Sequence, residues 1–450
     1  MISTDDGASD DLEGVHRSVV IVGGGQAGLS MSYCLTQQGV DHIVLERDRI
    51  GHEWRDRRWD SFCLVTPNWQ CQLPGYPYAG DDPDGFLVRD EIVRYIDEYA
   101  RSFGPPVVEG VAATRLRRDR KGRYLVGTSR GELIAEHVVL ATGPYQVPLI
   151  PRLADRLPDE LTQIHSSQYR SPDQLPPGEV LVIGSGQSGC QIAEDLHLAG
   201  RQVHLAVGSA PRVSRFYRGR DVVAWLEALG YYRKAVDEFA DVDAVRFRVN
   251  HYVTGRDGGR DIDLRAFARD GMRLYGRLIG AAGAALQFAP DLEQNLDHAD
   301  AVAEGIKDSI DSYIDAQRID APPEARYTPV WTPQRAATHL DLGDTEITSA
   351  IWSTGFGRDD RWIEVPVFDG RGYPTHDRGV TSCQGLYFLG LPWQHTWGSG
   401  RLSGIADDAA YLTERITTGT TPEHLFRWIA GTSTSTYPRD DEWVAPRTVA

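Results

Sequence analysis

Two glycine-rich segments are the residues of this chain whose types and spacing most clearly predict chemistry. They are Gly23-Gly24-Gly25-Gln26-Ala27-Gly28 and Gly184-Ser185-Gly186-Gln187-Ser188-Gly189. Each fits the pattern Gly-x-Gly-x-x-Gly: the first glycine allows a tight turn, the second lets backbone approach a pyrophosphate, and the third lets a helix pack against a strand. One such pattern is weak evidence, but two in matching contexts predict two bound dinucleotides.

The residues beyond the two glycine segments differ, and the difference predicts which dinucleotide each binds. Glu46, followed by Arg47, stands where an acid that accepts the ribose hydroxyls is expected, and its charge would repel a 2′-phosphate. The first segment therefore suits FAD, or else NAD. The second unit has no acid at the corresponding place but has Ser209 and Arg212, which favours the 2′-phosphate of NADPH. The alternatives are that Arg215 or Arg218 binds this phosphate, or that these arginines lie on a solvated loop.

Both glycine segments lie within predicted β-α-β units. Residues 18–22 read as a buried strand, 26–38 as a helix and 40–46 as a second strand, and residues 179–207 repeat this pattern. Further strands are expected within 107–140, 327–354 and 386–389, and a helix over 404–416. We therefore predict an α/β fold with two Rossmann-like dinucleotide-binding domains, one for FAD and one for NADPH.

The predicted domains follow the chain in five segments. A disordered acidic leader covers residues 1–15, and the first part of a discontinuous FAD domain covers 16–165. The NADPH domain, with a helical insertion, covers 166–319. The second part of the FAD domain covers 320–420, and a C-terminal tail covers 421–450.

Composition narrows the functional classes. The 450 residues suffice for two or three domains, and a net charge of -17 argues against nucleic acid and anionic membranes as partners. No apolar run is long enough to span a membrane. The five cysteines form no C-x-x-C pair, and their low number fits a cytoplasmic protein. No metal site is predicted, and the oligomeric state, a homodimer included, stays open.

Several motifs together resemble the class B flavoprotein monooxygenases. They are the two glycine segments, Ala141-Thr142-Gly143, and residues 165–170 with the sequence HSSQYR. The family includes flavin-containing monooxygenases, Baeyer–Villiger enzymes, N-hydroxylases and the plant auxin-forming enzymes, and its linker signature is F-x-G-x-x-x-H-S-x-x-Y/F. This chain keeps the second half of that signature, with Asp159 and Leu161 in place of Phe and Gly. More narrowly, residues 59–80 and 392–404 resemble flavin oxidoreductases encoded beside nitrilases in bacterial gene clusters.

The resemblance also implies which residues surround the flavin. Trp54 and Arg55 would lie against it, and Asn68 would lie beside the isoalloxazine. Within residues 392–404, His395, Trp397 and Arg401 would line the substrate pocket and act in catalysis. The alternative for these residues is structural: a packing role for Trp54, and a tryptophan-packed turn around His395.

As a function, the resemblance implies a monooxygenase with two half-reactions. NADPH would reduce FAD, and the reduced flavin would bind O₂ as a C4a-(hydro)peroxide and pass one oxygen atom to a small metabolite. The likeness to nitrilase-associated proteins points to a nitrogen-containing one. The alternatives are an NADPH-dependent flavin reductase or dehydrogenase without oxygen insertion, a flavin halogenase, and a flavin-binding redox sensor without turnover.

Overall fold

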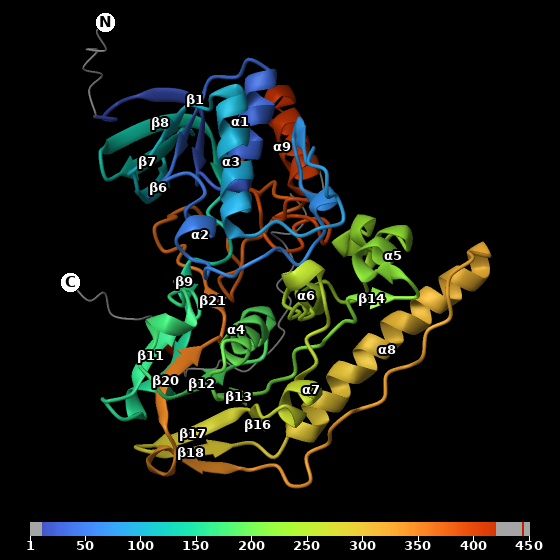
Figure 1. Cartoon of the computed structure of the whole chain (residues 1–450). Helices are drawn as coiled ribbons and strands as arrows, with labels where there is room; N and C mark the ends of the chain where they lie inside the picture. The colour runs from blue at the N-terminus through green and yellow to red at the C-terminus, as the bar shows by residue number, and fades with distance from the viewer. Residues whose placement is uncertain (1–10, 420–442, 445–450) are drawn as a thin grey trace, which may run out of the picture.

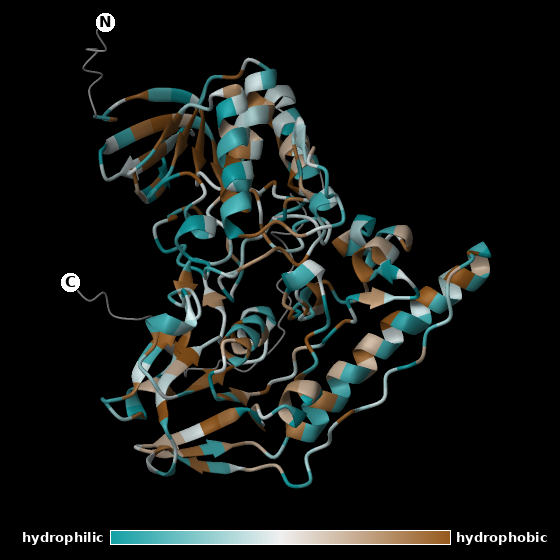
Figure 2. Cartoon of the chain, in the orientation of Figure 1, coloured by the Kyte–Doolittle hydropathy of each residue, from teal (hydrophilic) through white to brown (hydrophobic). Residues whose placement is uncertain are grey.

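The computed structural model of the chain describes residues 11–419 and 443–444. This part of the chain contains two sheets built on parallel strands, which lie in the upper and lower halves of Figure 1. Figure 2 shows that the central strands of both sheets are largely apolar. The predicted α/β fold with two Rossmann-like units is confirmed.

The first sheet has the strand order β5-β2-β1-β8-β7-β6, and β22 pairs with the end of β8. β1 (His16–Val22) and β2 (His42–Leu45) are buried over most of their length, as expected of parallel strands that are covered on both faces. Strands β6 to β8, which lie within the predicted strand region 107–140, form an antiparallel meander. The other strands are β5 (Val107–Val108), β6 (Ala113–Arg118), β7 (Tyr124–Thr128), β8 (Gly131–Leu140) and β22 (Leu386–Phe388).

Three helices cover one face of this sheet: α1 (Gln26–Gln37), α3 (Arg89–Phe103) and α9 (Ile405–Thr418) (Figure 1). Val19 and Ile21 of β1 pack against these helices, whereas Val20 and Val22 face the core under the meander. This alternation follows from the period of two residues along a strand.

The second sheet has the strand order β11-β20-β12-β13-β16, and all its pairs are parallel. Its strands are β11 (Thr162–His165), β12 (Glu179–Ile183), β13 (Val203–Ala206), β16 (Arg273–Tyr275) and β20 (Ile347–Trp352). One face packs on α4 (Gln187–Leu198), α7 (Leu264–Arg269) and the start of α8 (Leu292–Gln317). The other face packs on the antiparallel sheet of β17 (Leu278–Ala282), β18 (Ala285–Phe288) and β19 (His339–Asp341).

Shorter elements connect the two sheets and form the insertion. α2 (His52–Arg55) and the hairpin of β3 (Gln72–Leu73) and β4 (Tyr76–Pro77) follow β2. The insertion after β13 contains β14 (Phe216–Tyr217), β15 (Arg220–Asp221), α5 (Val222–Ala228) and α6 (Val242–Arg246). β9 (Val147–Pro148) pairs with β21 (Phe356–Gly357), and β10 (Ile150–Pro151) pairs with β23 (Trp443–Val444).

Two predicted domain boundaries are wrong, because distant strands complete the second sheet. The prediction assigns residues 320–420 to the FAD domain, but β20 lies between β11 and β12, where Ile351 pairs with both Ile164 and Val182. β11 also belongs to this sheet, although the prediction places it at the end of the 16–165 segment. An apolar run identifies a buried strand but not its neighbours in space.

The predicted disordered leader, residues 1–15, is wrong for its described part; residues 1–10 lie outside the described residues. Leu12 N–H donates to the Arg130 carbonyl at 2.8 Å, and Gly14 N–H to the Glu132 carbonyl at 2.9 Å. Leu12 and Val15 pack against the first sheet, which accounts for this order. The predicted tail, 421–450, lies outside the described residues except for β23. Within residues 11–419 and 443–444, no helix is long and apolar enough to cross a membrane.

Candidate functional site

The first glycine segment forms a tight loop between β1 and α1. Gly23 has a φ of +115°, and a Cβ on it would lie 2.4 Å from the Ala141 carbonyl oxygen. A Cβ on Gly28 would lie 1.8 Å from the Gly23 carbonyl oxygen, so only glycine lets α1 approach this closely. A Cβ on Gly25, by contrast, would meet no described atom within 4 Å. Gly25 therefore faces open space, as the backbone that contacts a pyrophosphate should.

The second glycine segment repeats this construction between β12 and α4. Gly184 has a φ of +103°, and its Cβ would lie 2.5 Å from the Ser353 carbonyl oxygen. A Cβ on Gly189 would lie 1.8 Å from the Gly184 carbonyl oxygen, as in the first unit. Gly186 lies against the insertion, because a Cβ on it would lie 3.9 Å from Val249 Cγ1. Gln187 anchors that insertion, since its Nε2 donates to the Val253 carbonyl at 2.7 Å.

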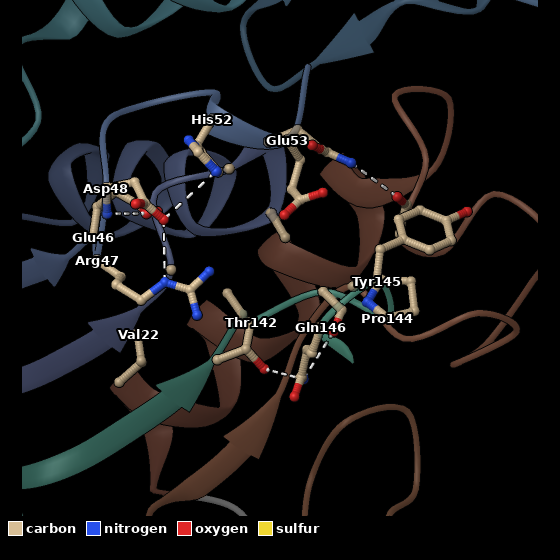
Figure 3. Close-up of a pocket in the computed structure, with 18 of the residues that line it drawn as sticks. Val22, Glu46, Arg47, Asp48, His52, Glu53, Thr142, Pro144, Tyr145 and Gln146 are labelled. Carbon is tan, nitrogen blue, oxygen red and sulfur yellow. Dashed lines mark hydrogen bonds and ion pairs between the residues drawn. The ribbon is translucent and has the colours of Figure 1, made fainter. Parts of the chain in front are cut away.

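A pocket of about 430 Å³ begins at the first glycine loop and extends to residues 399–401 (Figure 3). No described side chain caps α1, so the helix presents free N–H groups and its positive end beside this loop. Gln26 joins three walls of the pocket. Its Nε2 donates to the Gly400 carbonyl at 3.2 Å, and its Oε1 accepts from Trp54 Nε1 at 3.1 Å.

Glu46 lies at the end of β2 in the same pocket, as predicted for a ribose-binding acid. One carboxylate oxygen accepts from Gly24 N–H at 2.6 Å and the other from Asp48 N–H at 2.9 Å. Arg47 pairs with Asp48 at 3.1 Å, and His52 Nε2 lies 3.7 Å from the same carboxylate (Figure 3). The donor set fits an adenosine: free N–H groups for phosphates and a fixed carboxylate for ribose hydroxyls.

Arg401 is the predicted catalytic residue that the structure does place in this pocket. Its guanidinium lies over the Trp397 ring at 3.9 Å, donates to the Trp397 carbonyl, and donates from Nη2 to Asn250 Oδ1 at 3.0 Å. The loop that carries it is anchored by Ser399, whose Oγ donates to the buried Asp408 carboxylate at 2.6 Å.

Trp397 and His395 lie on the outer side of this loop and do not line the pocket. Trp397 packs on Tyr232 of the insertion, with ring centroids 4.5 Å apart. His395 lines a separate cavity with Trp69 and Gln70, and its carbonyl accepts from Val236 N–H at 2.7 Å. For these two residues the structure agrees with the alternative of a packed turn, here covered by the insertion.

Asn68 and Arg55 hold loops together and do not line the pocket either. Asn68 is buried, donates to the Asp82 carbonyl at 2.9 Å and accepts from Leu87 N–H at 2.7 Å. Arg55 pairs with Asp97 of α3 and donates to the Ile50 carbonyl at 3.1 Å. Trp54 does line the pocket. These contacts place Asn68 and Arg55 outside the pocket lining, and their predicted position beside the flavin stays a prediction.

Arg212 also has a different environment from the predicted one. It is buried, its Nε donates to Asp300 at 2.6 Å, and its guanidinium lies over the Tyr327 ring at 4.1 Å. This leaves no exposed guanidinium for a 2′-phosphate, because an acid distant in sequence already pairs with it. Ser209 is exposed beyond β13, and Ser185 Oγ accepts from Gly208 N–H at 2.9 Å, so a phosphate role for Ser209 stays a prediction.

The lining residues that are absent from the sequence predictions include Arg58, Tyr145 and Asn250. Arg58 lies over the rings of Trp54 and Tyr145, each at 5.4 Å. Tyr145 follows Ala141-Thr142-Gly143 at the carboxyl end of β8, and this position is a signal that could have identified it, because ligands bind at the carboxyl ends of parallel strands. Asn250 comes from the insertion and carries no such signal.

The cysteines do not form a redox pair. All five are free, and no described cysteine lines the pocket. Burial raises the pKa of the Cys63 thiol to about 11 and that of Cys71 to about 12, so neither is a thiolate at neutral pH.

Residues 20–255 match the family described as pyridine nucleotide-disulphide oxidoreductase. The chain belongs to this family. Membership confirms the predicted oxidoreductase activity and the predicted cofactors, FAD and NADP. An uncharacterised CzcO-like oxidoreductase of Geobacillus kaustophilus is 33% identical over 402 residues, which cover 88% of this chain and 97% of that protein.

The chain is also similar to flavin monooxygenases, in sequence over part of its length and in fold over most of it. The indole-3-pyruvate monooxygenase YUCCA1 of Oryza sativa is 32% identical over 197 residues, 43% of this chain and 48% of that one. A flavin-containing monooxygenase from Stenotrophomonas maltophilia superposes with a TM-score of 0.62 at 20% identity, covering 90% of this chain and 99% of that one. The predicted resemblance to flavoprotein monooxygenases is thereby confirmed at the level of fold and family.

Proposed function

We propose that this flavoprotein is an NADPH-dependent monooxygenase that inserts one oxygen atom from O₂ into a small metabolite. The overall reaction consumes substrate, O₂, NADPH and a proton, and yields the oxygenated product, NADP⁺ and water. The observation that carries the proposal is the pocket itself. It continues past the adenosine-binding acid Glu46 to Tyr145, Asn250 and Arg401, and no described cysteine lines it.

The absence of a thiol among the lining residues separates this proposal from disulphide reduction. A disulphide reductase passes electrons from its flavin to a cysteine pair, and Cys63 and Cys71, the two nearest each other in sequence, are buried, free and held protonated. Electrons that reach this pocket therefore need another acceptor. The likeness to YUCCA1 over 43% of the chain supports O₂ as that acceptor.

The residues of the chain bind and orient the cofactors and exclude water. FAD, when bound, accepts a hydride and activates O₂. The N-terminus of α1 and Gly25 would hold its phosphates, and Glu46 its ribose. Trp54 and Tyr145 line the pocket with aromatic rings, which would limit the contact of water with a bound flavin. α9 begins at Ile405, a few residues after the lining residues 399–401, and no described side chain caps its N-terminus, which favours negative charge nearby.

The second glycine unit would bind NADPH, with Gly186 at the phosphates and Ser209 at the 2′-phosphate. His165 is buried at the junction of the two units: Nε2 bonds to the Gly355 carbonyl and Nδ1 to Ser167 Oγ, each at 3.0 Å. Burial lowers the pKa of His165 to about 4, so it stays neutral and positions the junction.

The deciding experiment uses ¹⁸O₂. The FAD-loaded protein is reduced anaerobically with NADPH, mixed with ¹⁸O₂ and candidate small amines, ketones and acids, and the products are examined by mass spectrometry. We expect one ¹⁸O atom in product for each NADPH consumed. Quantitative release of H₂¹⁸O₂ with every candidate would indicate the alternative, a flavin reductase that reacts with O₂ only by leakage.

The five free cysteines also support a reducing compartment, so we propose a cytoplasmic location.

A further inference from the structure

The Arg401 guanidinium lies in the wall of the cofactor pocket without an acidic partner among the described residues. Its contacts are the Trp397 carbonyl, the Trp397 ring at 3.9 Å and Asn250 Oδ1 at 3.0 Å, all of them uncharged. The groups that raise its pKa electrostatically are Tyr145, Tyr231 and Tyr232, and no carboxylate is among them. Arg401 therefore brings a positive charge to the pocket that the described chain does not neutralise.

The three arginines that are buried in the described part of the chain are paired with acids. Arg212 and Arg265 share Asp300, at 2.6 and 2.8 Å, and the fully buried Arg215 bonds to Asp221 at 2.7 Å. This is what burial of a guanidinium requires, because an unpaired charge is costly to remove from water. Arg401 is half-buried and, unlike these three, has no acidic partner among the described residues; partial burial lowers its pKa. A ligand with a negative charge would supply the missing partner.

A second arginine strengthens the positive charge at this end of the pocket. Arg58 lies over Trp54 and Tyr145, each at 5.4 Å, and forms no ion pair with a described acid. Two of the acids that line the pocket, Glu46 and Asp48, lie on the side of the view opposite Tyr145 (Figure 3). Glu53 and Asp359 also line the pocket, but neither forms an ion pair with Arg58 or Arg401 among the described contacts.

The geometry of a guanidinium selects the shape of the anion. Arg401 donates one N–H to Trp397 and one to Asn250. The other N–H groups of its planar guanidinium are available to a ligand. A planar anion with two oxygens accepts two parallel hydrogen bonds from such a fork. The adjoining rings of Trp54 and Tyr145 offer apolar surface to the body of the same ligand.

We propose that the substrate of the proposed oxygenation carries a carboxylate, which Arg401 binds while Arg58 adds positive charge from across Tyr145. This inference rests on the proposed function, because it assigns the substrate class of the same pocket. A phosphate of the nicotinamide cofactor shares the oxyanion chemistry, and the experiment separates the two sources.

The experiment measures binding without NADPH or O₂. The FAD-loaded full-length protein is titrated anaerobically with carboxylates and their matched amides: acetate and acetamide, phenylacetate and phenylacetamide, 3-phenylpropionate and 3-phenylpropionamide. Perturbation of the flavin absorbance reports occupancy. We expect at least one carboxylate to bind about 10- to 100-fold more tightly than its amide, the range that charge-assisted hydrogen bonds give.

The variants Arg401→Met and Arg401→Lys test the residue, and Arg94→Met is the control, since Arg94 lies exposed on α3. We expect R401M to abolish the preference for the acid, R401K to retain part of it, and R94M to retain all of it. FAD content and thermal midpoint show whether each variant is folded; if R401M is not, R401K carries the test. Separate titration with NADP⁺ should show little change in R401M and R401K.

Three results of the binding experiment would overturn the inference. The first is that no carboxylate binds more tightly than its amide in the wild type. The second is that R401M and R401K retain the full preference. The third is that they weaken NADP⁺ and not the carboxylates, which would make Arg401 a partner of the cofactor phosphate. A failure of the proposed function shows differently: the carboxylate binds, but no ¹⁸O enters it. Insertion of ¹⁸O into neutral substrates alone would contradict the inference that the substrate carries a carboxylate, but it would agree with the proposed oxygenation.

Discussion

The two glycine units of this chain share one local structure but have different surroundings. From the first glycine to the end of the second strand they keep the same spacing, so Gly23 corresponds to Gly184, Gly28 to Gly189 and Glu46 to Val207. In both, the third glycine leaves no room for a Cβ beside the carbonyl of the first, at 1.8 Å. Short local sequence therefore builds the loop in each case.

What lies around each loop comes from distant parts of the chain. The first loop opens on a pocket that residues 399–401 also line, whereas the second loop lies against Val249 and is bonded to Val253. At the strand ends, Glu46 faces the pocket and Val207 is buried. The comparison teaches that the glycine pattern determines the loop, while ligand choice and access depend on segments that the pattern does not contain.

The largest effect is expected where the second unit differs most from its sequence prediction. Arg212→Ala would remove a buried guanidinium that pairs with Asp300. Breaking a buried ion pair costs about 3–5 kcal/mol. Because Asp300 keeps Arg265, we expect a loss near the lower end, about 3 kcal/mol, in the free energy of unfolding by urea. The Michaelis constants for NADPH and NADH should change by the same factor. A selective rise for NADPH would restore Arg212 as a phosphate partner.

Substitution of the third glycine in each unit tests whether the two units bind different cofactors. Gly28→Ala and Gly189→Ala each place a Cβ into a carbonyl oxygen, and overpacking of this kind costs about 1–3 kcal/mol. We expect G28A to purify with little FAD and G189A to keep its FAD but bind NADP⁺ poorly by calorimetry. Gly305→Ala on α8 is the control, because a Cβ on Gly305 would meet no described atom within 4 Å. Loss of FAD in both variants would mean that the units do not bind separate cofactors.

Glu46 of the first unit stands where the second unit has Val207, and its substitution tests this difference between the strand ends. Glu46→Gln removes the charge that accepts from Gly24 and Asp48 and that would accept from ribose. A hydrogen bond to a charged group contributes about 1.5–3 kcal/mol, so the Kd of FAD, measured by fluorescence, should rise about 10- to 100-fold. Glu53→Gln is the matched control, since Glu53 lines the same pocket from α2. Equal effects of the two substitutions would show that only the overall charge of the pocket matters.

The smallest effect concerns the helices that follow the loops. α1 carries Tyr33 and Cys34 where α4 carries Glu194 and Asp195. Burial, partly offset by Arg260 and Arg256, raises the pKa of Glu194 to about 7. A carboxyl whose pKa is raised on folding stabilises the protein while it is protonated, and this contribution is lost as pH rises from about 4.5 to 7.

Glu194→Gln should therefore lose this pH dependence. Between pH 5 and pH 8, the free energy of unfolding should fall by about 1–3 kcal/mol less in E194Q than in the wild type. The test compares the change in the free energy of unfolding between the two pH values and not the free energy itself, because the substitution also removes the ion pair with Arg260. Glu293→Gln, exposed on α8, is the control. Identical pH slopes in wild type and E194Q would contradict the raised pKa.

The sequence predicts best where function depends on neighbours in the chain. Both glycine loops and the acid Glu46 can be predicted from spacing alone, because each depends on residues within one β-α-β unit. Arg212 could not be predicted, because its partner Asp300 lies 88 positions further along. Family resemblance places Asn68 and His395 at the flavin site, but their loops turn them toward Asp82 and the insertion instead.

The position of β20 has a consequence for how the chain is made. β20 is central in the second sheet, between β11 and β12, yet it is synthesised more than 160 residues after them, since residues 347–352 pair with residues 162–165 and 179–183. A nascent chain that has not reached residue 347 exposes two unpaired strand edges, which are sites of aggregation. The first sheet likewise waits for β22 at residues 386–388. Neither unit can therefore complete its sheet on the ribosome before most of the chain has emerged.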